Sequence, residues 1–101
     1  MHNNGMRPVH PGEVLNKEYL EPLAVTPGEL ARALHVPPSN IHALIDERHG
    51  ISAELAIRLA TALGTSALFW LNLHNQYELR VAEIENGDSI RKQVHPIDFH
   101  T

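Results

Sequence analysis

The sequence predicts an all-α fold of five helices that contains a helix-turn-helix motif. Three observations predict it. No alternating run of five residues, as a half-buried strand would need, occurs before residue 90. Helix caps and stops recur along the chain. In addition, "ELARALHVPPSNIHALI" (residues 29–45) gives two short amphipathic helices separated only by a tight, proline-containing break.

Length and composition indicate one modest domain. The chain has 101 residues, of which 43% are hydrophobic, and its net charge is −4 with its eight histidines counted as neutral. It has no cysteine, no apolar run long enough to span a bilayer and no apolar signal core after its first residues. We therefore expect a cytosolic protein. The acidic balance counts mildly against nucleic-acid binding, although the distribution of charge matters more than its sum.

The first two helices are marked by prolines and a capping box. Pro11 can occupy the first turn of a helix that Pro22 is expected to end. The second helix should begin after Thr26, because Thr26, Pro27 and Glu29 have the spacing of a capping box. Its buried stripe is expected to comprise Leu30, Ala31 and Leu34.

The next two helices follow the same logic. A third helix should begin near Pro38 and bury Ile41, Leu44 and Ile45, although Pro37 offers no side-chain acceptor as an N-cap. Ser52 should cap the fourth helix and Gly64 should end it. The apolar positions of the fourth helix are Leu55, Ala56, Leu59, Ala60 and Leu63.

Thr65 should cap an extended fifth helix, residues 66–85, and Asn86-Gly87-Asp88 is expected to be a turn or breaker. We therefore predict one domain over residues 1–85, which contains the helix-turn-helix motif. A short C-terminal tail over residues 86–101 is expected to be partly disordered or to form a short edge strand at "SIRKQV".

The third helix is the candidate DNA-reading element, because a protruding helix fits a major groove about 12 Å wide. Counting 100° per residue, Ser39, Ala43 and Asp46 point away from the core, with Asn40, His42 and Glu47 beside them. Ser, Asn and His can bond base edges or phosphates, and Ala43 can touch a thymine methyl group. The alternative is that these polar residues simply coat a solvated helix.

The fifth helix has more apolar surface than one stripe requires, which is typical of a helix that packs on its own core and on a partner. We expect a two-fold interface made by Trp70, Leu73, Tyr77 and Val81. The alternative is that Trp70 and Tyr77 complete the core of one protomer, which is the favoured interpretation for Phe69.

Metal binding and catalysis are not expected. His35, His42 and His49 lie seven residues apart, but Pro37 and Pro38 break the helix that would align them. We expect His35 to serve the turn and His10 to serve the start of the first helix. Ser39, His42 and Asp46 share a convex helix without the concave pocket that a nucleophile and its base need. No cofactor is expected.

Three blocks in order, "HPGE", residues 30–52 and "FWLNL…YEL", resemble the HigA/VapI antitoxin family of Xre-type, lambda-repressor-like helix-turn-helix proteins. The resemblance covers residues 7–83 and implies a homodimer that binds double-stranded operator DNA, represses its own operon and neutralises a HigB-like, RelE-like ribonuclease toxin. It implies no enzymatic activity and no membrane association. The DNA-binding residues it implies are Pro38, Ser39, Asn40, His42, Ala43 and Arg48, the last as a phosphate contact.

Two alternatives stay open at this point. Relatives often have Arg at the position of Asn40, and many wider Xre proteins have Gln at the position of Pro27. The chain could therefore be a protein-interaction module with weakened DNA binding, or an orphan regulator with no toxin partner.

Overall fold

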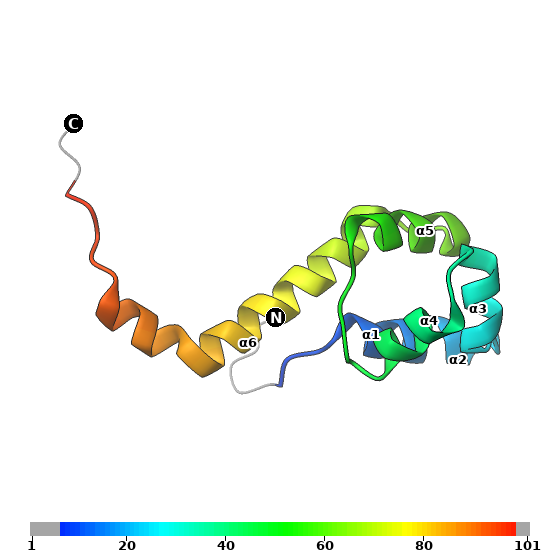
Figure 1. Ribbon diagram of the computed structural model, residues 1–101, viewed down its shortest axis with the longest axis horizontal. Helices are drawn as coiled ribbons and strands as arrows, with labels where there is room; N and C mark the ends of the chain where they lie inside the picture. Colours follow the sequence, from blue (N-terminus) through cyan, green and yellow to red (C-terminus); the bar gives the residue numbers. More distant parts are fainter. Residues whose placement is uncertain (1–6, 99–101) are drawn as a thin grey trace.

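The computed structural model describes residues 7–98, which are helical without any strand (Figure 1). The described part forms five helical segments, the first of which is built from three joined pieces. This confirms the all-α, five-helix prediction. The bounds are α1 Pro11–Val14, the π-helical η1 Leu15–Leu20, α2 Glu21–Leu23, α3 Pro27–Leu34, α4 Pro38–Ile45, α5 Ala53–Leu63 and α6 Ala67–Gln93.

The first segment does not end at Pro22, contrary to the sequence prediction. It continues to Leu23, and Ala24 then takes the left-handed conformation (φ 55°). The turn before Pro22 is π-helical, with the Glu21 N–H donating to the carbonyl of Asn16. A proline ring normally clashes with the carbonyl four residues earlier, and a wider turn is one way a helix accommodates this interruption.

A capping box defines the start of α3, as the sequence predicts. The Thr26 hydroxyl accepts a hydrogen bond from the Glu29 N–H at 3.1 Å, and the Glu29 carboxylate accepts one from the Thr26 N–H at 2.8 Å. Leu30, Ala31 and Leu34 are buried, which confirms the predicted stripe.

The boundary between α5 and α6 differs from the prediction by one residue. Ser52 caps α5 and Gly64 ends it with φ 73°, both as expected. The cap of α6 is Ser66, whose hydroxyl accepts from the Phe69 N–H, rather than Thr65. The Thr65 hydroxyl instead accepts a hydrogen bond from the indole N–H of Trp70 at 2.7 Å.

One hydrophobic core joins all the helical segments into a lobe, residues 7–81. α6 begins against α5, and α4 lies between α3 and α1. This arrangement positions α4 through contacts on two sides and leaves its remaining face to solvent. The core residues are Leu15, Leu20, Leu30, Ala31, Leu34, Ile41, Leu44, Ile51, Leu55, Ala56, Leu59 and Trp70.

The end of α6 leaves the lobe as an arm, residues 82–93, which gives the molecule its 54 Å length and its bent outline (Figure 1). Asn86-Gly87-Asp88 does not break the helix, and residues 89–93 are helical, so the predicted turn and edge strand are wrong. Residues 94–98 follow without helix or strand, and residues 1–6 and 99–101 of the predicted domains lie outside the described residues. Whether residues 86–101 form a separate unit stays a prediction.

Two features keep the arm helical around Gly87. Glu83 and Arg91 bridge over Gly87 through a 2.7 Å hydrogen bond, and Asp88 lies 4.0 Å from the same guanidinium. Among the described residues, no helix combines the length and the apolar content needed to cross a membrane.

Candidate nucleic-acid interface

The helices α3 and α4 form a helix-turn-helix unit with a turn of three residues. His35 ends α3 in the left-handed conformation (φ 58°), and its N–H donates to carbonyls of α3, which confirms its expected role in the turn. The Val36 N–H donates to the Ala31 carbonyl at 3.1 Å. Pro37 then starts α4 without any side-chain cap. Pro38 has no N–H and the Asn40 N–H donates to the Pro37 carbonyl at 3.0 Å, so the Ser39 N–H is the donor of the first turn that is left for water or a ligand.

Four of the predicted DNA-binding residues lie on the exposed part of α4. Pro38, Ser39, Asn40 and His42 are all exposed, so their side chains are free to meet a duplex. Pro38, Ser39 and His42 lie on the arc of the helix that faces away from the core, and Asn40 is exposed because it belongs to the first turn. Their DNA contacts stay predictions.

The prediction for Ala43 is wrong. Its side chain is only 7% exposed, so it cannot present a methyl group to a thymine. The single-stripe assumption fails because α4 packs against both α3 and α1, which buries a wider arc of the helix than one stripe. Asp46, which was expected to point outward with Ala43, is exposed.

Arg48 lies just beyond α4, where a groove-bound helix would meet the DNA backbone. Its guanidinium is 3.5 Å from the carboxylate of Asp46, and both side chains are more than 60% exposed. An exposed ion pair of this kind contributes about 0–1 kcal/mol, so Arg48 can exchange Asp46 for a phosphate at little cost. Glu47, between them in sequence, adopts the left-handed conformation (φ 61°).

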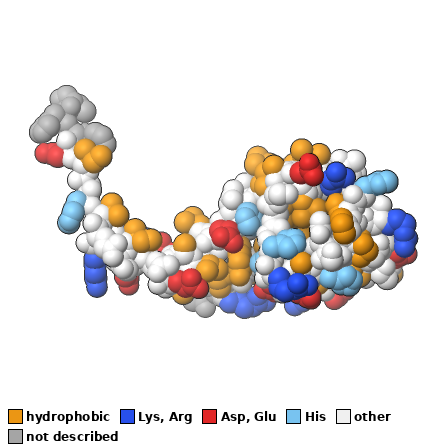
Figure 2. Space-filling model, viewed as in Figure 1, with side chains coloured by type: hydrophobic (Ala, Val, Ile, Leu, Met, Phe, Trp, Pro, Cys, Tyr) orange, Lys and Arg blue, Asp and Glu red, His pale blue; other side chains and the backbone are white. Residues whose placement is uncertain are grey.

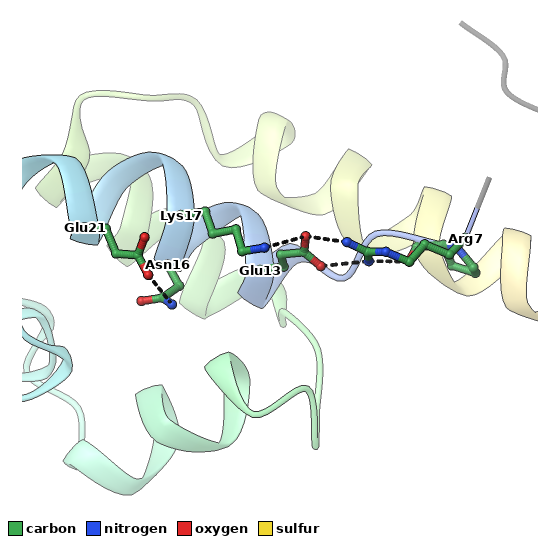
Figure 3. A network of polar contacts seen from close by, with 6 residues as sticks. Arg7, Glu13, Asn16, Lys17 and Glu21 are labelled. Carbon is green, nitrogen blue, oxygen red and sulfur yellow. Dashed lines mark hydrogen bonds and ion pairs between the residues drawn. The ribbon is translucent and has the colours of Figure 1, made fainter.

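A bonded network fixes the chain that enters α1 (Figure 3). The Arg7 guanidinium donates to both carboxylate oxygens of Glu13 at 2.8 and 2.7 Å, and Lys17 reaches the same carboxylate from the other side at 3.5 Å. The hydrogen bond from Arg7 is the main reason that the pKa of Glu13 is lowered to about 2. Two of the cations of the lobe are therefore already engaged by an acid.

Sequence reasoning gave His10 only a role at the start of α1, and the structure confirms that role and adds to it. His10 caps α1 by accepting a hydrogen bond from the Gly12 N–H at 2.9 Å, and its side chain is 4% exposed. Gly12 lies directly against the backbone of Leu44 in α4. A glycine immediately after a helix-starting proline was the available signal, because it indicates a close approach of backbones.

The structure overturns the dimer-interface prediction for one residue and leaves the other three as predictions. Trp70 is 0% exposed and donates its indole N–H to Thr65, so it belongs to the core of its own protomer and the interface prediction is wrong for it. Leu73, Tyr77 and Val81 are partly exposed. Their place in an interface between two copies stays a prediction.

Charge on the lobe is mixed rather than uniformly basic. On the face shown in Figure 2, histidines, basic groups and acidic groups lie side by side over the lobe. The eight residues of α4 include no Lys or Arg. Any DNA binding through this helix would therefore depend on hydrogen bonds and on cations next to the helix.

Comparison with known proteins gives consistent relatives, although no family model matches the chain. Virulence-associated protein I of Dichelobacter nodosus is 45% identical over 80 residues, which cover 79% of this chain and 74% of that protein. Antitoxin HigA-1 of Vibrio cholerae is 39% identical over 79 residues, covering 78% of this chain and 74% of the relative. The structure of Pseudomonas aeruginosa antitoxin HigA with the higBA promoter superposes with a TM-score of 0.87 at 42% identity, over 91% of this chain and all of that one.

Proposed function

Because the chain belongs to the family of helix-turn-helix proteins that includes antitoxin HigA and virulence-associated protein I, we propose that it is a DNA-binding antitoxin that represses its own operon. Its role is to bind, not to catalyse a reaction, and we place it in the cytoplasm, where its operator would be. The observation that carries the proposal is the exposed row of Pro38, Ser39, Asn40 and His42 on a helix that α3 and α1 hold from two sides.

The chemistry of this row suits base reading. A serine hydroxyl, an amide and an imidazole can each donate and accept hydrogen bonds, and an Asn amide pairs with the edge of adenine through two bonds. The uncapped first turn of α4 adds the backbone N–H of Ser39 as a donor for a phosphate, and Arg48 adds a charge at the other end of the helix. Together these groups would fix the register of α4 in a groove and read bases there.

Specific binding would require two such helices. A single recognition helix buries little surface, whereas a dimer places two of them about 34 Å apart on one side of a palindromic site. Exposed apolar side chains on the second half of α6 offer contacts for a second copy: Leu79, near the end of the lobe, is 69% exposed, and in the arm Ile84 is 58% and Ile90 48% exposed. Leu73, Tyr77 and Val81, which are partly exposed and four residues apart on α6, would extend the interface into the lobe.

A second candidate function has an observation in its favour. The recognition helix has no Lys or Arg, and the nearby Arg48 is paired with Asp46. A protein that has kept the fold but lost strong DNA binding would serve as a protein-interaction module, and one without a toxin would be an orphan regulator. Titration with DNA separates these alternatives from the main proposal.

The first experiment measures binding to the DNA upstream of the protein's own gene by fluorescence anisotropy, with a scrambled duplex of equal length as reference. Ser39→Ala and Asn40→Ala should each weaken binding to the upstream DNA by about 1–3 kcal/mol and leave binding to the scrambled duplex unchanged. Asn72→Ala, an exposed Asn on α6, is the matched control and should bind as the wild type does. Equal affinity of the wild type for both duplexes would reject operator recognition.

The toxin partner requires its own test. We propose that the partner is a RelE-like ribonuclease encoded next to this gene, and co-expression should yield a stable complex of the two products. The complex should suppress the growth arrest that the neighbouring gene causes when it is expressed alone. An adjacent gene whose product neither arrests growth nor co-purifies with this protein would favour the orphan regulator.

A further inference from the structure

The loop that follows α4 lies against two histidines from different parts of the chain. The Ile51 N–H donates to Nδ1 of His74 in α6 at 3.4 Å. Burial lowers the pKa of His10, and the nearby backbone of His49 acts in the opposite direction. Residues 49–51 therefore bond to a ring from α6 and lie beside a second ring at the start of α1.

Two glycines allow close contacts near this loop. A side chain at Gly50 would overlap the ring of His74, and a side chain at Gly12 would overlap the carbonyl of Leu44 in α4. Each glycine lies where backbone must pass directly against a neighbouring group, which is a position that other residues cannot occupy without displacement. One of these contacts is therefore at the last turn of α4, and the other is in the loop that follows it.

The ring of His10 also contacts α6. The edge of its ring meets Tyr77 with the ring centroids 4.8 Å apart and the planes at 74°, which is a favourable aromatic geometry. Nδ1 accepts the Gly12 N–H, so the proton of the neutral ring is on the other nitrogen. Among the described residues, His10 is the only polar or charged residue classed as buried.

We propose that His10 and His74, with the loop residues 49–51, form a histidine clasp that sets the orientation of α4 relative to α6. This inference rests on the proposed function: if two copies pair through α6, the clasp fixes the separation of their two recognition helices. His10 and His74 are then positioning residues for specific DNA binding, although neither needs to touch DNA. The clasp would determine which half-site spacing the dimer accepts.

The test compares half-site spacing preferences in clasp variants. His74→Ala removes the acceptor of the Ile51 N–H, and His10→Asn keeps a side-chain oxygen that can cap α1 but is too short to reach Tyr77. His95→Ala, at an exposed position beyond α6, is the matched control. Each protein is titrated with the natural operator and with versions whose half-sites are moved by one base pair in either direction.

The wild type and His95→Ala should prefer the natural spacing by about tenfold or more, an effect comparable to that of one mismatched base pair in a specific site. The two clasp variants should lose most of that preference while binding the scrambled duplex as before. In DNA-free protein, the Ile51 amide should exchange its hydrogen faster in His74→Ala than in the control.

The outcomes separate the two proposals. Clasp variants that keep the wild-type spacing preference, or that lose affinity equally for all duplexes, would overturn the clasp. A wild type that does not distinguish its upstream DNA from the scrambled duplex would overturn the proposed function and, with it, the role of the clasp in DNA recognition. Unchanged exchange of the Ile51 amide in His74→Ala would overturn the contact itself.

Discussion

The lobe and the arm are both helical, but different interactions keep them so. In the lobe, α3 and α5 begin at side-chain caps and end at left-handed residues, and the helices pack on one another. In the arm, every residue except Gly87 is exposed, and the described interactions are ion pairs along a single helix. The lobe therefore has structure that one protomer stabilises by itself, whereas the arm has a surface that lacks a partner.

This difference explains which parts of the fold the sequence could predict. Thr26, Ser52 and Gly64 are local signals, and packing in the lobe agrees with each of them. Asn86-Gly87-Asp88 is also a local signal, but the helix continues through it, since Glu83 and Arg91 bond to each other across Gly87. A pair eight residues apart is outside the spacing that local helix rules consider.

The candidate site was predictable only where one helix decided the outcome. Ser39, Asn40 and His42 are exposed as their positions on α4 predict. Ala43 and Trp70 are buried in helices that each pack against more than one element, and periodicity within one helix carries no information about a second neighbour. The contact of Gly12 with Leu44 and that of Gly50 with His74 are likewise long-range in sequence.

The largest expected difference between the two regions concerns their apolar side chains. Trp70→Ala should lower the free energy of unfolding by about 3–5 kcal/mol, because it empties a fully buried site. Ile84→Ala, at a 58% exposed position of the arm, should have an effect that depends on protein concentration, since it removes only surface for a second copy. Urea unfolding at several protein concentrations measures both. A concentration-independent loss in Ile84→Ala would show that the arm packs within one protomer.

Replacing a glycine by alanine should have opposite effects on stability in the lobe and in the arm. Gly12→Ala should destabilise the lobe by about 1–3 kcal/mol, because its methyl group would overlap the backbone of α4, which cannot move aside easily. Gly87→Ala would meet only the mobile ends of Glu83 and Arg91, and alanine favours a helix by about 1 kcal/mol over glycine. Thermal unfolding should therefore shift in opposite directions for the two variants. A destabilised Gly87→Ala would indicate that the arm needs close backbone contact there.

Caps should have a smaller effect, confined to the lobe. Thr26→Ala removes half of the capping box and should cost about 1 kcal/mol of stability. Thr61→Ala is the matched control, because the Thr61 hydroxyl only donates back to the Ile57 carbonyl within α5, and alanine suits a helix interior. Equal losses in the two variants would contradict the role of the cap.

The smallest difference is in pH dependence. Burial lowers the pKa of His10 below its usual 6.5, against the opposing influence of Glu47 and Glu78 and with that of His74. The unfolded chain then binds the proton more readily, so stability from His10 is complete above pH 6.5 and falls as the pH drops through the lowered value. In the arm, the hydrogen bond from Arg91 lowers the pKa of Glu83, so its contribution is lost only at more acidic pH, below 4.5.

Unfolding monitored by Trp70 fluorescence should therefore lose stability first in the window just below pH 6.5. His10→Asn, which does not titrate there, should flatten the profile in that window. A profile that His10→Asn leaves unchanged would show that another group causes the acid sensitivity.

Operator recognition by this protein depends on two copies of α4 reaching one face of a duplex. Hydroxyl-radical footprinting of the upstream DNA tests this directly. We expect two protected patches on the same side of the duplex, separated by about 10–10.5 base pairs, and their loss in Asn40→Ala. A single patch, patches on opposite sides, or protection that Asn40→Ala leaves intact would contradict it.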